Sequence, residues 1–430
     1  MIAAGHRAYP VGGGIRDVLL GRRVVDWDVA TSARPEDMLA LFARVIPTGI
    51  AHGTVTVLTG RSQVEVTTFR GDIGYTDGRH PDQVVFLKSL KEDLKRRDFT
   101  INAMAYDTAG DRIIDPHQGR RDLKKGIVRA VGDPLRRFAE DGLRPLRAVR
   151  FATVLEFEIE KRTFTAIGKR LKVFRKVAPE RVRVELQKIL GSRQAHRGIE
   201  LLNQCGLLEE IIPELKPSMG FAQNRFHKYD VYGHTLKCLE HARGDAVLKM
   251  AVLLHDVAKP QTAEGPEGER TFYGHEKASA RVAKRVLKRL RFSNQERQRV
   301  ETLISSHMFH YLPEWTDGAV RRLVRRVGPE LLDDIYELRR ADAWGRGVGI
   351  RDTLANLTML KDRIARVMAE DAALKVTDLT IGGEEVMQVL GIGPGPRVGK
   401  ILDALLEQVL DDPSLNQPKK LKSLIESLGL

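Results

Sequence analysis

The chain has 430 residues, with 71 Lys or Arg residues against 57 Asp or Glu residues, and its formal net charge is +14. This length predicts two to four domains, and the basic excess favours nucleic acid as a partner over a merely soluble basic protein. Two cysteines, Cys205 and Cys238, exclude a disulfide framework and a cysteine-type zinc site, and the lack of a long apolar run or a signal core predicts a cytoplasmic protein with no membrane partner.

The first part of the chain, residues 1–125, alternates short β-rich runs with turns. Runs at 53–58 and 63–69 are rich in Val and Thr, and a helical pattern lies between them and the N-terminus, near residues 35–42. This alternation predicts an α/β head with a mixed sheet and helices. The segment from Gly71 to Pro81 is rich in Gly, Asp, Thr and Arg, and we expect a mobile loop there.

A glycine turn followed by two carboxylates is the most informative feature of the head. Gly12, Gly13 and Gly14 precede Arg16 and Asp17, and Asp26 and Asp28 follow one residue apart. Backbone N–H groups of such a turn can cradle a triphosphate, and residues i and i+2 of a strand face the same side. Converging carboxylates offer the oxygen ligands that Mg²⁺ prefers, so the stretch predicts a Mg²⁺ site for nucleotide transfer.

Glu65 is the candidate for a third carboxylate at this site. Its neighbours Val64 and Val66 should face the core, which leaves Glu65 on the opposite face of its strand. A solvated strand glutamate is the alternative.

From about residue 126 the pattern becomes helical and remains so to Leu430, with a predicted domain boundary at residues 216–220. Asp141, Arg144, Arg147 and Arg150 are spaced three apart, which places them along one stripe if all four are helical. Asp and Arg together can complement the edges of cytosine or adenine, whereas the alternative is a solvated helix face with ion pairs. Pro145 is compatible with a helix that begins close to it.

The second half contains a separate group of histidines and aspartates. These residues lie at the ends or starts of predicted helical runs, and they can bind one or two divalent metals if they converge. The candidates are His234, His255, Asp256, His275, His307 and Asp342.

Four blocks in order give the chain its resemblance to a known family. They are the glycine and Asp-x-Asp block, Arg96-Arg97-Asp98-Phe99-Thr100-Ile101-Asn102, Glu140-Asp141-x-x-Arg144-x-x-Arg147-x-x-Arg150, and Glu180-Arg181-Val182-Arg183-Val184-Glu185. The chain thereby resembles the class II tRNA nucleotidyltransferase and bacterial poly(A) polymerase family over nearly its whole length. The histidine group resembles the HD phosphohydrolase superfamily, whose domain some tRNA nucleotidyltransferases carry.

The resemblance implies an organisation in four domains. It predicts a polymerase-β-like nucleotidyltransferase head over residues 1–125, a helical neck that recognises the base over 126–216, an HD metal-binding domain over 221–345, and an RNA-binding helical tail over 346–430. The neck, body and tail should be all-α.

The resemblance also implies roles for single residues. Asp26, Asp28 and Glu65 would be catalytic, with Mg²⁺ on the aspartates, and a second divalent metal of unknown identity would occupy the HD site. The nucleotide-binding residues would be Gly12, Gly13, Arg16, Asp17, Arg97, Asn102, Asp141, Arg144, Arg147 and Arg150.

The implied function is template-independent addition of C and A residues to tRNA 3′ ends, with tRNA, CTP and ATP as partners and two-metal catalysis. An A-adding enzyme or a poly(A) polymerase shares the same head motifs. A metal-dependent phosphohydrolase is the alternative from another class, and a non-catalytic RNA-binding module has no need for the carboxylates.

Overall fold

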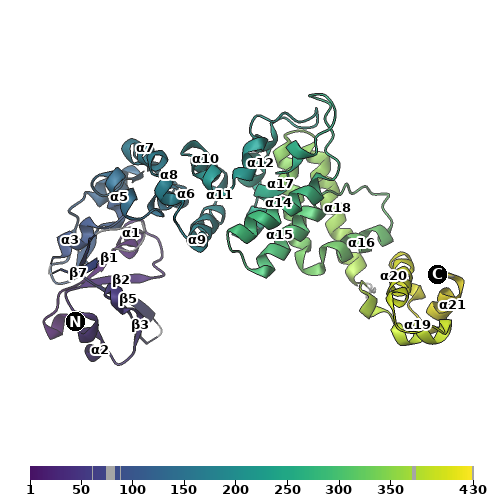
Figure 1. Cartoon of the computed structure of the whole chain (residues 1–430), viewed down its shortest axis with the longest axis horizontal. Coiled ribbons are helices and arrows are strands. Elements are labelled where there is room, and N and C mark those ends of the chain that lie inside the picture. The colour runs from purple at the N-terminus through teal and green to yellow at the C-terminus, as the bar shows by residue number, and fades with distance from the viewer. Residues whose placement is uncertain (61, 74–82, 88, 370–373, 429–430) are drawn as a thin grey trace. The chain divides into compact units, whose positions relative to one another are not determined.

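The protein, seen here as a computed structural model, divides into two compact units (Figure 1). The described residues are 1–60, 62–73, 83–87, 89–369 and 374–428. The first unit comprises Met1–Pro213 with Arg289–Arg291, and the second comprises Glu214–Lys288 with Phe292–Leu430. The division lies close to the boundary expected at residues 216–220, whereas the finer division into four domains stays a prediction.

A seven-stranded mixed sheet forms the amino-terminal part of the first unit (Figure 1). Its order is β3-β4-β5-β2-β1-β8-β9, and β2 and β5 run parallel while the other neighbouring pairs are antiparallel. The strands are β1 (Ala8–Val11), β2 (Trp27–Thr31), β3 (Val45–Gly49), β4 (Thr54–Thr59), β5 (Ser62–Thr68), β8 (Ala105–Asp107) and β9 (Arg112–Ile114). The predicted α/β head with a mixed sheet is confirmed.

The side chains on the two faces of this sheet pack into two different hydrophobic cores. Val55, Val57 and Val66 pack with Met38 in a small core on one face. Ala30 and Phe69 pack with Leu94 and other residues in a second core. Because strand side chains alternate, Asp28 points to the same side as Ala30, and Glu65 points away from the side that Val66 occupies.

In its described residues, the first unit contains four α-helices between or just after the strands of the sheet, and seven further α-helices follow them along the chain. The first four are α1 (Gly13–Leu19), α2 (Pro35–Leu41), α3 (Leu90–Lys95) and α4 (Gly119–Lys125). The rest are α5 (Pro134–Glu140), α6 (Arg144–Leu155), α7 (Lys161–Lys169), α8 (Leu171–Phe174), α9 (Pro179–Leu190), α10 (Ala195–Gln204) and α11 (Leu207–Ile211). Pro145 occupies the first turn of α6, where its missing N–H is not needed by the helix.

Two details differ from the sequence expectations. The region after residue 126 is not wholly helical, because β10 (Ile127–Val128) and β11 (Glu158–Ile159) form a short parallel pair. Gly71 belongs to β6 (Arg70–Ile73), which pairs with β7 (Gln83–Phe86). Residues 74–82, most of the expected mobile loop, lie outside the described residues.

The second unit is helical in its described residues. Its elements are α12 (Val231–His241), α13 (Ala246–Leu254), α14 (His275–Arg289), α15 (Asn294–Ser306), α16 (Asp317–Val327), α17 (Leu332–Arg346), α18 (Ile350–Ala369), α19 (Gly383–Leu390), α20 (Pro396–Asp411) and α21 (Pro418–Leu428). In the last three helices, Ile401, Leu405 and Val409 recur at every fourth position of α20 and pack against Val386 and Leu421. Among the described residues, no helix is both long and apolar enough to span a bilayer.

Candidate active site and candidate metal centre

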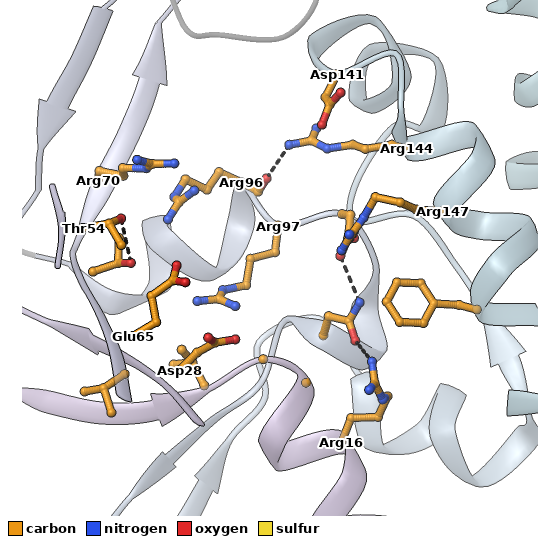
Figure 2. A pocket seen from close by; sticks show the side chains of 18 of the residues that line it. Arg16, Asp28, Thr54, Glu65, Arg70, Arg96, Arg97, Asp141, Arg144 and Arg147 are labelled. Carbon is orange, nitrogen blue, oxygen red and sulfur yellow. Dashed lines mark hydrogen bonds and ion pairs between the residues drawn. The ribbon is translucent and has the colours of Figure 1, made fainter. Parts of the chain in front are cut away.

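A polar cavity of about 470 Å³ opens beside the sheet of the first unit (Figure 2). Seven arginines and four carboxylates line it, so its walls favour a polyanion. The lining residues are Val11, Gly12, Gly13, Arg16, Asp28, Val29, Thr54, Glu65, Thr67, Arg70, Arg96, Arg97, Asp98, Asn102, Asp141, Arg144, Arg147, Arg150 and Phe151.

Asp28 and Glu65 lie side by side in this cavity. They are register partners on the parallel strands β2 and β5, so their side chains leave the sheet on the same face. Asp26 is placed differently, because it precedes the first residue of β2, is exposed and does not line the cavity. The charge of Asp26 nevertheless acts on both Asp28 and Glu65.

Burial and mutual repulsion disfavour the charged forms of these carboxyls. The pKa of Asp28 is raised chiefly by burial and also by Asp26, while Arg97 opposes the shift. The pKa of Glu65 is raised by burial and by Asp28. A divalent cation between carboxylates that repel one another in this way would stabilise their charged forms, so this donor set fits Mg²⁺.

Gly12 brings the backbone close to Asp28 and Arg97. Its φ of 74° favours glycine, and a Cβ built there would lie 2.8 Å from Nη1 of Arg97 and 3.4 Å from Oδ2 of Asp28. Gly13 begins α1 and lines the cavity beside it. Oδ2 of the buried Asp93 lies 3.5 Å from Nη2 of Arg97, so the glycine turn, the strand that carries Asp28 and an arginine meet at one place.

A chain of hydrogen bonds joins the glycine-turn block to the arginine row. Arg16 Nη1 donates to Oδ1 of Asn102 at 2.7 Å, and Asn102 Nδ2 donates to Oδ1 of Asp98 at 3.1 Å. Asp98 in turn accepts from Nε and Nη2 of Arg147 at 2.9 and 2.6 Å. Asp17 does not line the cavity, but its carboxylate pairs with Nη2 of Arg16, which does, at 2.8 Å.

Arg150 is held by a second carboxylate and an aromatic ring. Oε2 of Glu185 lies 2.6 Å from Arg150 Nε, and the guanidinium carbon lies 3.7 Å from the centre of the Phe151 ring. Burial lowers the pKa of Arg150 to about 10, while Glu185 opposes the shift. The group therefore stays cationic near neutral pH.

The expected base-reading pair departs from the helix stripe that its spacing suggested. Asp141 is extended and precedes α6, where its carboxylate accepts the N–H of Leu143 at 2.9 Å and pairs with Arg181 at 3.1 Å. Arg144 begins α6 and is bound by Glu140 at 2.6 Å. The single-stripe expectation is therefore wrong for Asp141, although both side chains line the cavity (Figure 2).

Several lining residues carried no usable sequence signal. Arg70, Thr54 and Thr67 come from strands whose register alone places them at the cavity, and the two threonine hydroxyls are 3.0 Å apart. Asp98 belongs to the motif at residues 96–102, but its pairing with Arg147 depends on the fold.

A second cluster, in the described part of the second unit, brings together all six residues predicted as a metal site. Asp256 lies at its centre: Oδ2 is 3.2 Å from Nε2 of both His234 and His255, and Oδ1 is 3.2 Å from Nε2 of His275 and 3.8 Å from that of His307. Oδ1 of Asp342 lies 3.3 Å from Nε2 of His234. The two oxygens of Asp256 therefore face two adjacent groups of ligand atoms.

Backbone carbonyls orient three of the histidines in this cluster. Nδ1 of His255, His275 and His307 lies 2.8, 2.7 and 2.7 Å from the carbonyl oxygens of Val252, Phe272 and Ile304. This contact keeps the proton on Nδ1 and leaves Nε2 free to bind a metal.

The donor set fits one or two divalent cations. Asp256 is 1% exposed, and neither of its oxygens has a well-aligned hydrogen bond, although Nζ of Lys259 lies 2.7 Å from Oδ2. A buried carboxylate oxygen that lacks a hydrogen bond lowers the stability of the folded protein unless a nearby cation compensates its charge. Burial lowers the pKa of His255, but the Asp256 charge outweighs it and raises that pKa to about 10, so without metal a proton supplies the missing positive charge.

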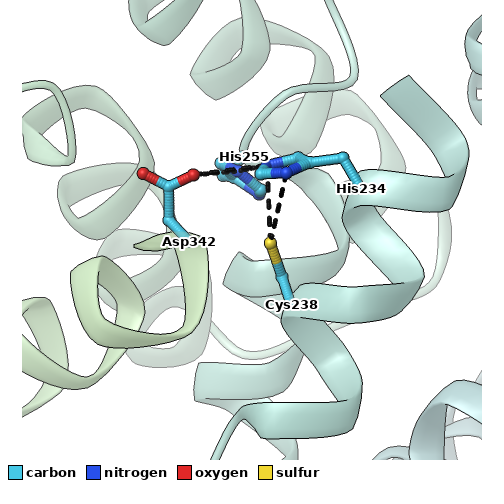
Figure 3. Close-up of side chains that lie close together, drawn as sticks. All are labelled: His234, Cys238, His255 and Asp342. Carbon is cyan, nitrogen blue, oxygen red and sulfur yellow. Dashed lines mark hydrogen bonds and ion pairs between the residues drawn. The ribbon is translucent and has the colours of Figure 1, made fainter. Parts of the chain in front are cut away.

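One residue beside the cluster, Cys238, was not among the six predicted from the sequence. Sγ of Cys238 lies 3.4 Å from Nε2 of His234, and His234, Cys238, His255 and Asp342 offer ligand atoms that all lie within 4.8 Å of one another (Figure 3). The cysteine count excluded a site built from cysteines, and it did not anticipate a single cysteine beside the histidines. Cys205 lies elsewhere, in the first unit, with its Sγ 3.5 Å from the carbonyl of Leu202.

Three family models match consecutive parts of the chain. The "Poly A polymerase head domain" matches residues 8–129, the "Probable RNA and SrmB- binding site of polymerase A" matches residues 156–219, and a model of tRNA nucleotidyltransferase domain 2 matches residues 274–425. The chain belongs to the tRNA nucleotidyltransferase and poly(A) polymerase family. None of the three models covers His234, His255 or Asp256, so an HD domain in this family member stays a prediction.

The chain is also similar to individual CCA-adding enzymes. The CCA-adding enzyme of Ligilactobacillus salivarius is 47% identical over 225 residues, which are 51% of this chain and 55% of that protein, and the Lactobacillus helveticus CCA-adding enzyme is 49% identical over 208 residues, or 48% and 52%. The chain thus spans about half the length of the curated relatives it matches. The crystal structure of the Bacillus stearothermophilus CCA-adding enzyme in complex with CTP matches 100% of this chain and 94% of its own, with 28% identity and a TM-score of 0.73.

Proposed function

We propose that this protein is a template-independent RNA nucleotidyltransferase that adds C and A residues to tRNA 3′ ends from CTP and ATP. The observation that carries the proposal is the register pair Asp28–Glu65 in a cavity lined by seven arginines. Binding alone does not need adjacent carboxylates that repel one another, whereas metal-assisted transfer does. The net charge of +14 suits tRNA as the second substrate.

The chemistry follows from the position of each group. Mg²⁺ held by Asp28, with Asp26 and Glu65 nearby, would activate the terminal hydroxyl and neutralise the departing pyrophosphate. Arg97 and Arg16 are placed to bind the triphosphate, because both line the cavity next to the glycine turn. Gly12 and Gly13 let the backbone approach the phosphates without a side chain in the way.

Asp141 and Arg144 are proposed to select the base. The Asp offers an acceptor and the Arg a fork of donors, which together complement the polar edges of cytosine and adenine. Arg181 and Glu140 hold the two side chains in place, while Asp98 and Glu185 hold Arg147 and Arg150 along the same wall. The base-reading wall is therefore fixed by ion pairs before a nucleotide binds.

Addition of A alone and synthesis of poly(A) are the competing activities, and product length separates them. The full chain is incubated with tRNA ending at the discriminator base, in CC or in CCA, with CTP and ATP separately and together. We expect growth to CCA and no further when both are present. Extension only from CC with ATP would identify an A-adding enzyme, and long A tails would identify a poly(A) polymerase.

Asp28→Asn is the matching loss-of-function variant. It keeps the shape of the side chain and removes its charge, and we expect incorporation to fall by at least about a hundredfold because a metal ligand is lost. Asp107→Asn is the control, since Asp107 ends β8 of the same sheet and does not line the cavity. Near-normal turnover by Asp28→Asn would refute the assignment of the transfer site.

The buried histidine cluster supports a second candidate function, metal-dependent hydrolysis of a phosphate ester. Asp256 bridges two groups of Nε2 atoms, a geometry suited to one or two divalent metals that activate water. The test is release of phosphate from a 2′,3′-cyclic nucleotide or a terminal phosphate in the presence of Mn²⁺, Co²⁺, Ni²⁺ or Zn²⁺. Activity that survives in the Asp256→Asn variant would refute it.

A further inference from the structure

The cluster around Asp256 has an unusual member, because a thiol sits among its imidazoles and carboxylates. Cys238 is fully buried and lies one helical turn after His234 on α12, so both side chains occupy the same face of that helix. Figure 3 shows its sulfur pointing toward His234, with His255 and Asp342 beside it. Cys238 lies outside the residues that the three family models match.

The distances agree with a shared metal ligand set. A tetrahedral zinc ion with bonds of about 2.0–2.3 Å to N, O and S holds its ligand atoms roughly 3.3–3.6 Å apart. The corresponding separations here are 3.2 Å between Nε2 of His234 and of His255, 3.3 Å from His234 to Asp342 and 3.4 Å from His234 to Cys238. Nε2 of His255 lies 3.8 Å from Oδ1 of Asp342, and the four ligand atoms all lie within 4.8 Å of one another, so small movements of these buried side chains would bring them around one ion.

The surroundings of Cys238 keep its sulfur in this position. A Cβ at Gly345, on α17, would lie 2.2 Å from Sγ of Cys238 and 2.9 Å from Nδ1 of His234. The absence of a side chain at residue 345 therefore makes the room that the thiol and the imidazole share. Arg339 pairs with Oδ2 of Asp342, which leaves Oδ1 of that carboxylate facing the cluster.

We propose that the Cys238 thiolate is a ligand of the metal held by His234, His255 and Asp342, and that this centre therefore prefers a thiophilic ion such as Zn²⁺ or Co²⁺ to Mg²⁺ or Ca²⁺. The inference rests on the metal centre proposed above and adds its ligand set and its metal class. On binding, the thiol loses its proton to solvent and the sulfur lone pair forms the bond to the metal. Soft sulfur ligands favour Zn²⁺ and Co²⁺, whereas Mg²⁺ and Ca²⁺ prefer oxygen.

The test is spectroscopic and uses the full chain stripped of metal. Titration with Co²⁺ should produce a near-ultraviolet thiolate-to-cobalt charge-transfer band. X-ray absorption of the Zn²⁺ form should show one sulfur neighbour at about 2.3 Å. Both signals should vanish in Cys238→Ser and Cys238→Ala and persist in Cys205→Ser, the control that changes the other buried cysteine.

Metal selectivity gives a second readout. Zn²⁺ affinity should fall at least about tenfold in Cys238→Ser, while Mn²⁺ affinity changes much less, because Mn²⁺ does not depend on sulfur. The thermal unfolding profile shows whether each variant is folded, and nucleotide incorporation shows whether the first unit is undisturbed. If Cys238→Ser does not fold, Gly345→Ala replaces it, since its Cβ would lie 2.2 Å from Sγ of Cys238 and should remove the charge-transfer band. Because this Cβ would also approach His234, X-ray absorption must show the sulfur neighbour lost and the nitrogen neighbours kept.

The outcomes separate this inference from the proposals on which it rests. Zn²⁺ bound by nitrogen and oxygen alone, or a sulfur signal that survives in Cys238→Ser, overturns the thiolate ligand and leaves the metal centre standing. Failure of the wild-type chain to bind any of these ions overturns the metal centre as well. Neither result bears on nucleotide addition, which is measured separately in the first unit.

Discussion

The ion pair between Asp98 and Arg147 should be the most consequential one at the cavity, because it joins an arginine near the start of α6 to the motif at residues 96–102. Asp98 is buried, and it accepts from Arg147 at 2.9 and 2.6 Å, from Asn102 at 3.1 Å and from the N–H of Phe99 at 2.8 Å. Asp98→Ala removes all four bonds and leaves a guanidinium without its main partner.

The expected magnitude follows from burial. Breaking a buried pair costs about 3–5 kcal/mol, and the Arg147 side chain is 32% exposed toward a water-accessible cavity, so we expect the low end of that range, about 3 kcal/mol. In a double-mutant cycle with Arg147→Ala, the coupling between the two residues should be about 2 kcal/mol.

The assay must report on the first unit alone. Trp27 is its only tryptophan, since the other two are Trp315 and Trp344. Replacing those two by Phe makes intrinsic fluorescence during urea unfolding a reporter of the first unit, and the Asp98 and Arg147 variants are made in that background. A coupling below about 0.5 kcal/mol, the value of an exposed surface pair, would refute the reasoning.

The pH dependence provides an independent check. Burial alone would raise the pKa of Asp98, but Arg147 and Asn102 outweigh it and hold that pKa well below its ordinary value. A carboxyl with a depressed folded-state pKa contributes stability above its unfolded-state pKa of about 3.9, and this stability is lost as the pH falls below it. The free energy of unfolding should therefore decline less steeply below about pH 4 in Asp98→Asn than in the wild type, and identical slopes would contradict the assignment.

Four further outcomes are expected. Gly12→Ala should reduce incorporation sharply, because the new Cβ would meet Arg97 and because a positive φ in a residue other than glycine costs about 1–3 kcal/mol of backbone strain. Steady-state kinetics and thermal unfolding together test this. Arg144→Ala should weaken discrimination between CTP and ATP by roughly 1–3 kcal/mol while tRNA affinity is kept, and the reverse pattern in competition and binding assays would place the residue at the RNA. The logarithm of RNA affinity should fall steeply with the logarithm of salt concentration, and a flat plot would assign the basic excess another purpose. His255→Ala with Asp256→Ala should abolish metal binding and any phosphatase activity but leave incorporation largely intact, provided that calorimetry shows a folded protein.

Local pattern was sufficient to predict the α/β head and to nominate the residues proposed to act in it. The strand at 63–69, the helix near 35–42 and the placement of Glu65 opposite Val64 and Val66 follow from side-chain alternation and periodicity, which are properties of neighbouring residues. The four motif blocks likewise lie within short stretches of sequence. The histidine and aspartate set could be assembled because His-Asp adjacency and helix-end positions are also local features.

Only the tertiary structure decided which groups pair across the chain. Asp141 leaves the helix stripe because its carboxylate caps the turn before α6 and pairs with Arg181, and no spacing rule contains that contact. Asp26 stays outside the cavity because β2 begins one residue after it. Cys238 lies one helical turn from His234, but the packing of α12 against α17 at Gly345 is what brings both beside Asp342. Sequence pattern determines what a segment can form, whereas contacts between distant segments depend on packing, which local periodicity does not encode.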